Sequence, residues 1–207
     1  MIAIVDYGMG NLHSVSKAVE RLGAQAKVTA DPKELAAADG IILPGVGAFG
    51  DAMQALDAAG LTEVLKELAH DSKPLLGICL GMQLLFETSE EHGNHKGLGL
   101  LQGRVVRFEP GGYKVPHMGW NELHWRDPAH PLVKGLDEGH VYFVHSYHAL
   151  AGDPSDVIAV CEYAGREVTA IVARGPVYGM QFHPEKSGQL GMQLLEQYVK
   201  SLTLTAI

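Results

Sequence analysis

The first half of the chain alternates short, unbroken apolar runs with stretches in which apolar residues recur at helical spacing. Residues 2–6 (IAIVD) form a continuous apolar run that ends at a turn, which is typical of a strand buried on both faces. From Val15 to Leu22 the apolar residues follow the spacing of one helix face, and Gly23 marks the helix end. The alternation continues with strands at 25–29, 40–44 and 74–79, and with helices at 32–37, 61–69 and 80–89. This order predicts a parallel sheet with right-handed connections and helices on both faces.

The second half has a different pattern, in which short apolar runs are separated by turns. Strands are predicted near 105–108, 140–143, 157–162, 169–174 and 177–182, and a final helix over 190–202. We therefore expect an α/β fold, with a mostly parallel, doubly wound sheet and an antiparallel extension in the second half. Ligands of such open sheets bind at the carboxyl ends of the strands, where residues 44–47 and Cys79 both lie.

Composition and charge narrow the function classes. No repeat or long linker interrupts the chain, so we interpret residues 1–207 as a single domain. The net charge is −8 and no block of lysine and arginine is present, which counts against binding to nucleic acid or to a membrane surface. No apolar run approaches the ~20 residues that a membrane-spanning helix needs. No basic segment precedes the first strand, so we expect no signal peptide.

The cysteines and histidines do not suggest a metal site. The two cysteines, Cys79 and Cys161, lie in unrelated contexts, which favours free thiols in a reduced, cytoplasmic protein. Eleven histidines are present, but none belongs to a Cys/His cluster with ligand spacing. We therefore expect neither a metal nor another cofactor.

The sharpest local motif is Gly-Ile-Cys-Leu-Gly at 77–81, between a predicted buried strand and a predicted helix. It has the form of a nucleophile elbow, G-x-S-x-G, with cysteine in place of serine. The helix N-terminus behind Cys79 would stabilise a thiolate, and the backbone N–H of Leu80 could donate to an oxyanion. The alternative is that Cys79 is a small buried residue that only closes a strand.

A nucleophilic thiol needs a base, and the base needs a residue that orients it. His183-Pro184-Glu185 offers both, because residues i and i+2 of an extended segment point the same way. The alternative is a surface turn with incidental polar side chains. The glycine-rich segment 44–47 could supply a second oxyanion donor, and it matches neither common phosphate-loop pattern.

Taken together, these segments resemble class I (triad-type) glutamine amidotransferases. Within that family the chain is most similar to the glutaminase subunits of imidazole glycerol phosphate synthases, which serve histidine biosynthesis. The resemblance runs almost from end to end, through DYGMGNLHSV (6–15), LPGVGAFGDAM (43–53), GICLGMQLLFE (77–87), KVPHMGWN (114–121), YFVHSYH (142–148) and GMQFHPEKS (179–187).

The resemblance implies a flavodoxin-like fold and a Cys-His-Glu triad of Cys79, His183 and Glu185. Cys79 would attack the carboxamide of glutamine and form a γ-glutamyl thioester, with release of ammonia. His183 would move the protons, and Glu185 would hold its tautomer. Other roles are implied by the same blocks: Val46, Gly47 and Leu80 at the oxyanion, and Gln83, Ser146 and Tyr147 at the amino-acid end of the substrate.

The resemblance also implies a partner, a separate (βα)₈-barrel synthase subunit that receives the ammonia and makes imidazole glycerol phosphate and AICAR. The matching blocks leave no room in this chain for a barrel of roughly 250 residues. Asn11, Trp120 and Lys186 would face this partner in a heterodimer. The residues alone leave Trp120 open between an interface anchor and a core residue, and they assign Cys161 to packing.

Three other functions are weighed against this one. A non-catalytic protein on the same fold is disfavoured because Cys79, His183 and Glu185 are all present. A different triad glutaminase, such as the glutaminase subunit of pyridoxal phosphate synthase or of anthranilate synthase, is disfavoured by the segments DYGMGNL and PHMGWN. A cysteine peptidase would share the elbow but would have no reason to carry the other blocks.

Overall fold

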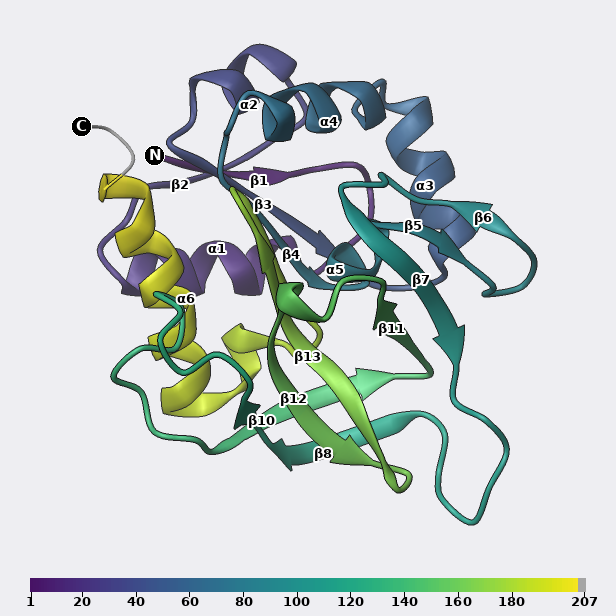
Figure 1. The fold of residues 1–207 in the computed structure, drawn as a ribbon. Helices are drawn as coiled ribbons and strands as arrows, with labels where there is room; N and C mark the ends of the chain where they lie inside the picture. Colours follow the sequence, from purple (N-terminus) through teal and green to yellow (C-terminus); the bar gives the residue numbers. More distant parts are fainter. Residues whose placement is uncertain (205–207) are drawn as a thin grey trace.

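A computed structural model describes the backbone of residues 1–204 and the side chains of residues 1–202. It is built on one eight-stranded sheet (Figure 1). In spatial order its strands are β2 (Ala26–Thr29), β1 (Ile2–Val5), β3 (Gly40–Gly45), β4 (Leu75–Cys79), β14 (Val177–Met180), β13 (Arg166–Arg174), β12 (Val157–Tyr163) and β9 (His124–Trp125). From β2 to β14 neighbouring strands run parallel, and from β14 to β9 they run antiparallel. The expected fold class is thereby confirmed.

Helices cover both faces of the parallel strands (Figure 1). One face packs against α1 (Leu12–Arg21) and α6 (Gly188–Leu204). The other packs against α2 (Pro32–Ala37), α3 (Phe49–Ala58), α4 (Thr62–His70) and α5 (Leu80–Leu84). Strand β1 is apolar throughout because both of its faces are buried. Ile2 and Ile4 point into one core, Ala3 and Val5 into the other, so no position faces water.

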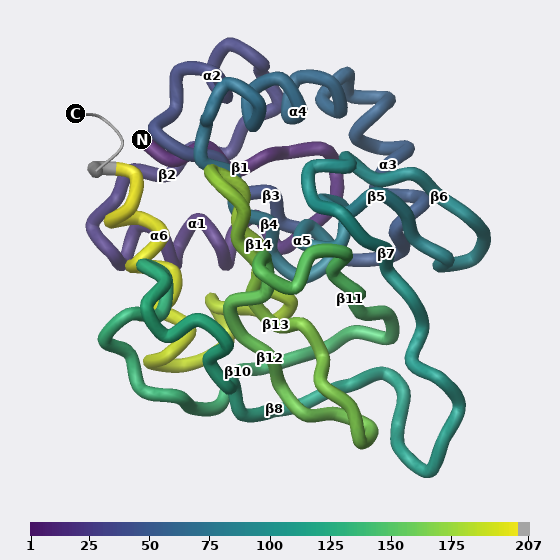
Figure 2. The backbone as a smooth tube through the Cα atoms, viewed as in Figure 1, coloured from purple at the N-terminus to yellow at the C-terminus, as the bar shows by residue number. Residues whose placement is uncertain are grey.

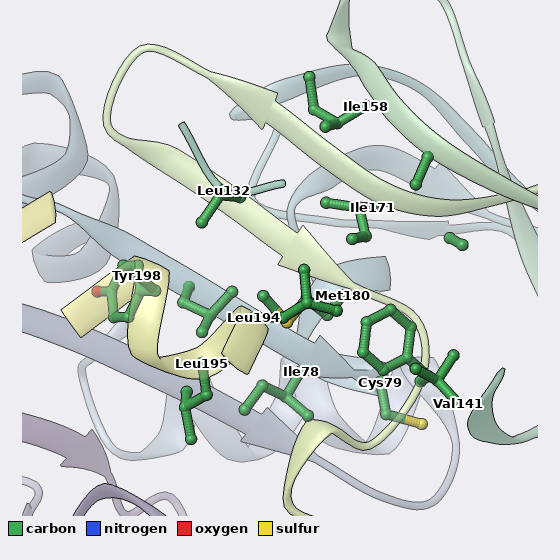
Figure 3. Close-up of a cluster of buried hydrophobic side chains, with 14 of the residues drawn as sticks. Ile78, Cys79, Leu132, Val141, Ile158, Ile171, Met180, Leu194, Leu195 and Tyr198 are labelled. Carbon is green, nitrogen blue, oxygen red and sulfur yellow. The ribbon is translucent and has the colours of Figure 1, made fainter. Parts of the chain in front are cut away.

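The first of these cores reaches the end of β4. Figure 3 shows Leu194, Leu195 and Tyr198 of α6 beside Ile78, with Cys79 next along the chain. The Cys79 sulphur lies at the edge of the side chains drawn there (Figure 3).

Two smaller sheets complete the fold, and the tube in Figure 2 follows the chain through them. One pairs β10 (His140–His145) with β8 (His117–Glu122), and the other contains β11 (Tyr147–Ala151), β7 (Leu101–Arg107), β5 (Phe86–Ser89) and β6 (His95–Lys96). The sequence predicted the regions of β7 and β10 but neither their partners nor β9. Two 3₁₀ turns, η1 (Pro154–Asp156) and η2 (Pro184–Lys186), join the remaining elements.

The helix expected over 80–89 is wrong in its second half. The helix stops at Leu84, and residues 86–89 form strand β5 instead. The carbonyls that would continue the helix are used elsewhere, because Leu84 O accepts from Leu98 N and Leu85 O accepts from Leu100 N. A distant segment therefore ends this helix, and no signal in 80–89 reveals it.

Helix α3 was missed, although its pattern is present in the sequence. Phe49, Ala52, Met53 and Leu56 are buried at i, i+3, i+4 and i+7. The glycines at 45, 47 and 50 are typical of a loop, and the helix begins within this stretch. Within residues 1–204, no helix is both long and apolar enough to cross a membrane.

Candidate active site

Cys79 sits on a strained turn between β4 and α5. Its backbone has φ 56° and ψ −114°, a region that residues with a side chain rarely adopt. The two flanking glycines are required by close packing. A Cβ on Gly77 would lie 2.5 Å from the Gly81 carbonyl oxygen, and a Cβ on Gly81 would lie 1.9 Å from the Leu43 carbonyl oxygen. The motif therefore forms a true elbow, which presents Cys79 at the carboxyl end of the sheet.

The elbow opens into a pocket of about 220 Å³. Cys79 lines this pocket and is 7% exposed, with its Sγ 3.9 Å from the Val144 carbonyl oxygen. Cys161 is 0% exposed, and burial raises the pKa of its thiol to about 12. Of the two free thiols, Cys79 is the one that a ligand in the pocket can reach.

His183 and Glu185 form a buried pair beside Cys79. His183 Nδ1 lies 2.9 Å from Glu185 Oε1, and the two side chains are only 4% and 1% exposed. Burial by itself lowers the pKa of His183. Hydrogen bonding and charge from Cys79 and then Glu185 outweigh burial and raise the pKa to about 9. The imidazole therefore has the thiol on one side and a carboxylate on the other.

The turn that carries this pair is fixed to strand β10. Ser187 Oγ donates to the His183 carbonyl at 2.6 Å and accepts from Tyr142 N at 2.9 Å. His183 N donates to the Tyr142 carbonyl at 3.1 Å. The expected extended geometry is wrong in detail, because η2 begins at Pro184 and the 3₁₀ turn brings the carboxylate back to the imidazole.

The segment 44–47 runs beside the start of α5 and lines the pocket with its last two residues. Val46, Gly47 and Leu80 all line the pocket. The Tyr7 hydroxyl donates to the Pro44 carbonyl at 2.8 Å and so fixes the start of this segment. Gly47 has φ 99°, a value that favours glycine.

The remaining expected residues belong to the same pocket. Gln83, Ser146 and Tyr147 all line it. Gln83 Nε2 donates to Tyr147 O at 2.9 Å and to Gln181 Oε1 at 3.0 Å. Both amide hydrogens are thereby used, so Gln83 can offer the pocket only its Oε1, an acceptor.

Glu91 is a pocket residue that sequence analysis missed. It lines the same pocket, and its Oε2 accepts from Phe49 N at 2.8 Å, at the N-terminus of α3. The local run Ser-Glu-Glu-His at 89–92 carries no motif that separates Glu91 from its acidic neighbour. Only the fold, which returns this loop to the elbow, identifies it.

The three residues expected at a partner surface lie outside the pocket. Trp120 is 56% exposed on β8, and Met118 on the same face of that strand is 61% exposed, so the core interpretation of Trp120 is wrong. Lys186 is exposed in η2, and Asn11 is half-buried before α1, which contacts η2. The Trp120 ring approaches Gly188, just after η2. Trp120 and the segment before α1 therefore both lie near η2.

Comparison with known proteins agrees with this geometry. The family model for class-I glutamine amidotransferases matches residues 3–201. The chain belongs to this family. The amidotransferase is 58% identical to imidazole glycerol phosphate synthase subunit HisH of Geobacillus kaustophilus, over 96% of each chain. It is 54% identical to the HisH subunit of Sulfurimonas denitrificans, over 97% of this chain and 98% of that one.

Solved structures support the fold of the amidotransferase. A crystal structure of a glutamine amidotransferase superposes with a TM-score of 0.77 at 20% identity, covering 98% of this chain and 100% of the other. The structure of PurLQS from Thermotoga maritima gives a TM-score of 0.77 at 21% identity, covering 97% and 98% of the two chains. Within residues 1–204 no group of three or more His, Cys, Asp or Glu side chains is arranged to hold a metal ion.

Proposed function

We propose that this amidotransferase hydrolyses glutamine to glutamate and ammonia through a thioester on Cys79. The observation that carries the proposal is the Cys79–His183–Glu185 arrangement at the wall of a pocket. His183 takes the thiol proton as Cys79 Sγ bonds to the carboxamide carbon, and it gives that proton to the leaving nitrogen as the C–N bond breaks. His183 then takes a proton from the water that attacks the thioester, and it returns this proton to Sγ as the C–S bond breaks. Glutamate leaves and the thiol is restored.

The residues around Cys79 would stabilise the tetrahedral intermediates. The Leu80 N–H would be one backbone donor and the Val46–Gly47 peptide would supply the second, since all three residues line the pocket. Backbone donors of this kind are each worth about 10²–10³ in rate. Glu185 would keep the Nδ1 proton on His183, so that Nε2 serves the reacting atoms.

Other residues of the pocket fit the charges of an amino acid. Gln83 Oε1 and the Glu91 carboxylate are acceptors suited to the α-ammonium group. The backbone N–H groups of Ser146 and Tyr147 are donors suited to the α-carboxylate. Acceptors for the ammonium and donors for the carboxylate select a free amino acid over a peptide or a simple amide.

We further propose that residues 1–207 act as one glutaminase domain in the cytoplasm, although residues 205–207 lie outside the described part of the chain. The ammonia would pass to a separate (βα)₈-barrel synthase that makes imidazole glycerol phosphate and AICAR, in a heterodimer. The relatives named as HisH subunits support this, together with the exposed Met118 and Trp120. No cofactor, nucleic acid or membrane is required.

The test is glutamine-dependent release of glutamate, measured with the synthase subunit and its substrate present. Cys79→Ala should lower the rate at least about 10⁴-fold, because the nucleophile is lost. Ammonia-dependent synthesis by the partner should continue, since that chemistry belongs to the partner. A glutamine-like electrophile should label Cys79 and leave Cys161 unmodified. Glutaminase activity retained by the alanine variant would contradict the proposal.

A further inference from the structure

A line of hydrogen bonds leads from the pocket wall at His145 through side chains to which the reaction assigns no role. His117 on β8 and His145 on β10 face each other in register, with His117 Nδ1 3.0 Å from His145 Nε2. At one end Asn121 Nδ2 lies 3.2 Å from His117 Nε2. At the other end His145 Nδ1 lies 2.8 Å from the Tyr147 carbonyl oxygen.

The direction of every hydrogen bond in this line is fixed by its ends. A carbonyl oxygen only accepts, so His145 Nδ1 carries a proton and donates to Tyr147 O. Neutral His145 then accepts at Nε2, which requires His117 to donate from Nδ1 and to accept at Nε2 from Asn121. The Asn121 amide is oriented independently, because its Oδ1 accepts from Glu122 N at 2.9 Å.

Burial keeps both histidines neutral, which this single order of donors and acceptors requires. Burial lowers the pKa of His145 to about 3 and the pKa of His117 to about 4. The His117 ring is also held between aromatic rings, with centroids 3.9 Å from Tyr163 and 4.6 Å from Phe143. The His117 ring cannot turn without breaking this packing.

The line ends on a group that shapes the substrate pocket. Tyr147 O accepts from His145 Nδ1 and also from Gln83 Nε2 at 2.9 Å. That bond turns the Gln83 amide so that only its Oε1 remains for a ligand. Tyr147 also contributes the backbone proposed for the α-carboxylate.

We propose that His145, supported by His117 and Asn121, is a positioning residue for glutamine, because it fixes the Tyr147 carbonyl and through it the Gln83 amide. This inference rests on the proposed glutaminase function. It assigns to the buried histidines a part in substrate binding and none in proton transfer. Loss of the donor to Tyr147 O should therefore raise KM more than it lowers kcat.

Two substitutions of His145 separate its two hydrogen bonds. Asparagine places an amide N–H where Nδ1 stood, so His145→Asn keeps the donor to Tyr147 O and loses the acceptor for His117. Glutamine places its amide where Nε2 stood, so His145→Gln keeps the acceptor and loses that donor. We expect KM for glutamine to be about tenfold higher in His145→Gln than in His145→Asn, with kcat values within about threefold.

His148 provides the matched control. It is also buried, at 1% exposed against 6% for His145, and lies outside the line. His148→Asn and His148→Gln should share one KM even if both lower the unfolding temperature. If the His145 variants fail to fold, the same comparison is made at His117, the next residue in the line. His117→Gln should then have a higher KM than His117→Asn.

The outcomes separate this inference from the function on which it rests. Absence of glutamine hydrolysis by the wild-type heterodimer would overturn the proposed function. An active wild type with equal KM in His145→Asn and His145→Gln would overturn the positioning role alone. A KM difference of the same size between the two His148 variants would also overturn the positioning role, because substitution of any buried histidine would then explain the His145 result.

Discussion

At the scale of single residues, the proton on His183 is a stabilising feature of the folded state. Its pKa in the folded protein is raised to about 9, against about 6.5 in the unfolded chain. The folded state therefore binds more protons between these two values. The stabilisation is fully present below pH 6.5 and is lost as the pH rises through 9.

The free energy of unfolding of the wild type should therefore fall between pH 6.5 and 9, by about 1.4 kcal/mol for each unit by which the pKa is raised. Glu185→Gln removes one of the charges that raise this pKa, so its pH curve should be flatter. Denaturant unfolding at several pH values measures both curves. Parallel curves for the two proteins would show that Glu185 does not set the pKa of His183.

Sequence alone made Cys79 and His183 candidates, because each lies in a short motif whose chemistry is local. Glu91 and the His117–His145 pair were beyond its reach. Glu91 enters the pocket only through the fold of its loop, and the two histidines meet only through the register of β8 with β10. Twenty-eight positions separate those histidines, and no short-range pattern specifies such a pairing.

At the scale of elements, the contact between α5 and β3 controls the elbow. Gly81→Ala would place its Cβ 1.9 Å from the Leu43 carbonyl oxygen, and a backbone group in a central strand cannot move aside as a side chain does. We expect a loss of stability of about 3 kcal/mol or more, together with a loss of activity as Cys79 shifts. Chemical unfolding and the glutaminase assay measure the two effects.

Gly112→Ala is the control for this substitution, because no atom lies within 4 Å of the Cβ that it would add. Its stability should change by no more than about 0.5 kcal/mol. A Gly81→Ala protein as stable as the Gly112→Ala protein would show that α5 can move away from β3.

The elements that could be predicted are those with complete local patterns, such as β1 and α1. The end of α5 could not be predicted, because Leu98 and Leu100 take the carbonyls that would continue it. Strands β5 and β6 flank the loop that carries Glu91 into the pocket. This part of the fold is determined by backbone pairing over long range, which periodicity does not reveal.

At the scale of the whole molecule, strand β8 connects an outer face with the buried interior. Met118 and Trp120 point outward, while His117 faces the interior on the opposite side of the strand. The segment 44–47, which lines the pocket, is held at its start. The Tyr7 hydroxyl donates to the Pro44 carbonyl, and a Cβ on Gly45 would lie 2.7 Å from Gly81 N. The start of the loop is therefore rigid, so the Val46–Gly47 peptide is where an oxyanion donor can turn in or out.

We expect the synthase partner to control this peptide, so that the isolated subunit is slow and the complex is about 10²–10³ times faster, the worth of one oxyanion donor. Trp120→Ala should weaken the complex by more than tenfold, because exposed aromatic anchors dominate such interfaces. Leu150→Ala, at an exposed apolar residue on β11, is the control and should leave affinity within twofold. Glutamate production titrated with the synthase and its substrate measures affinity and activation together. An isolated subunit already at full speed would exclude the switch, and equal affinities for the two variants would place the docking surface elsewhere.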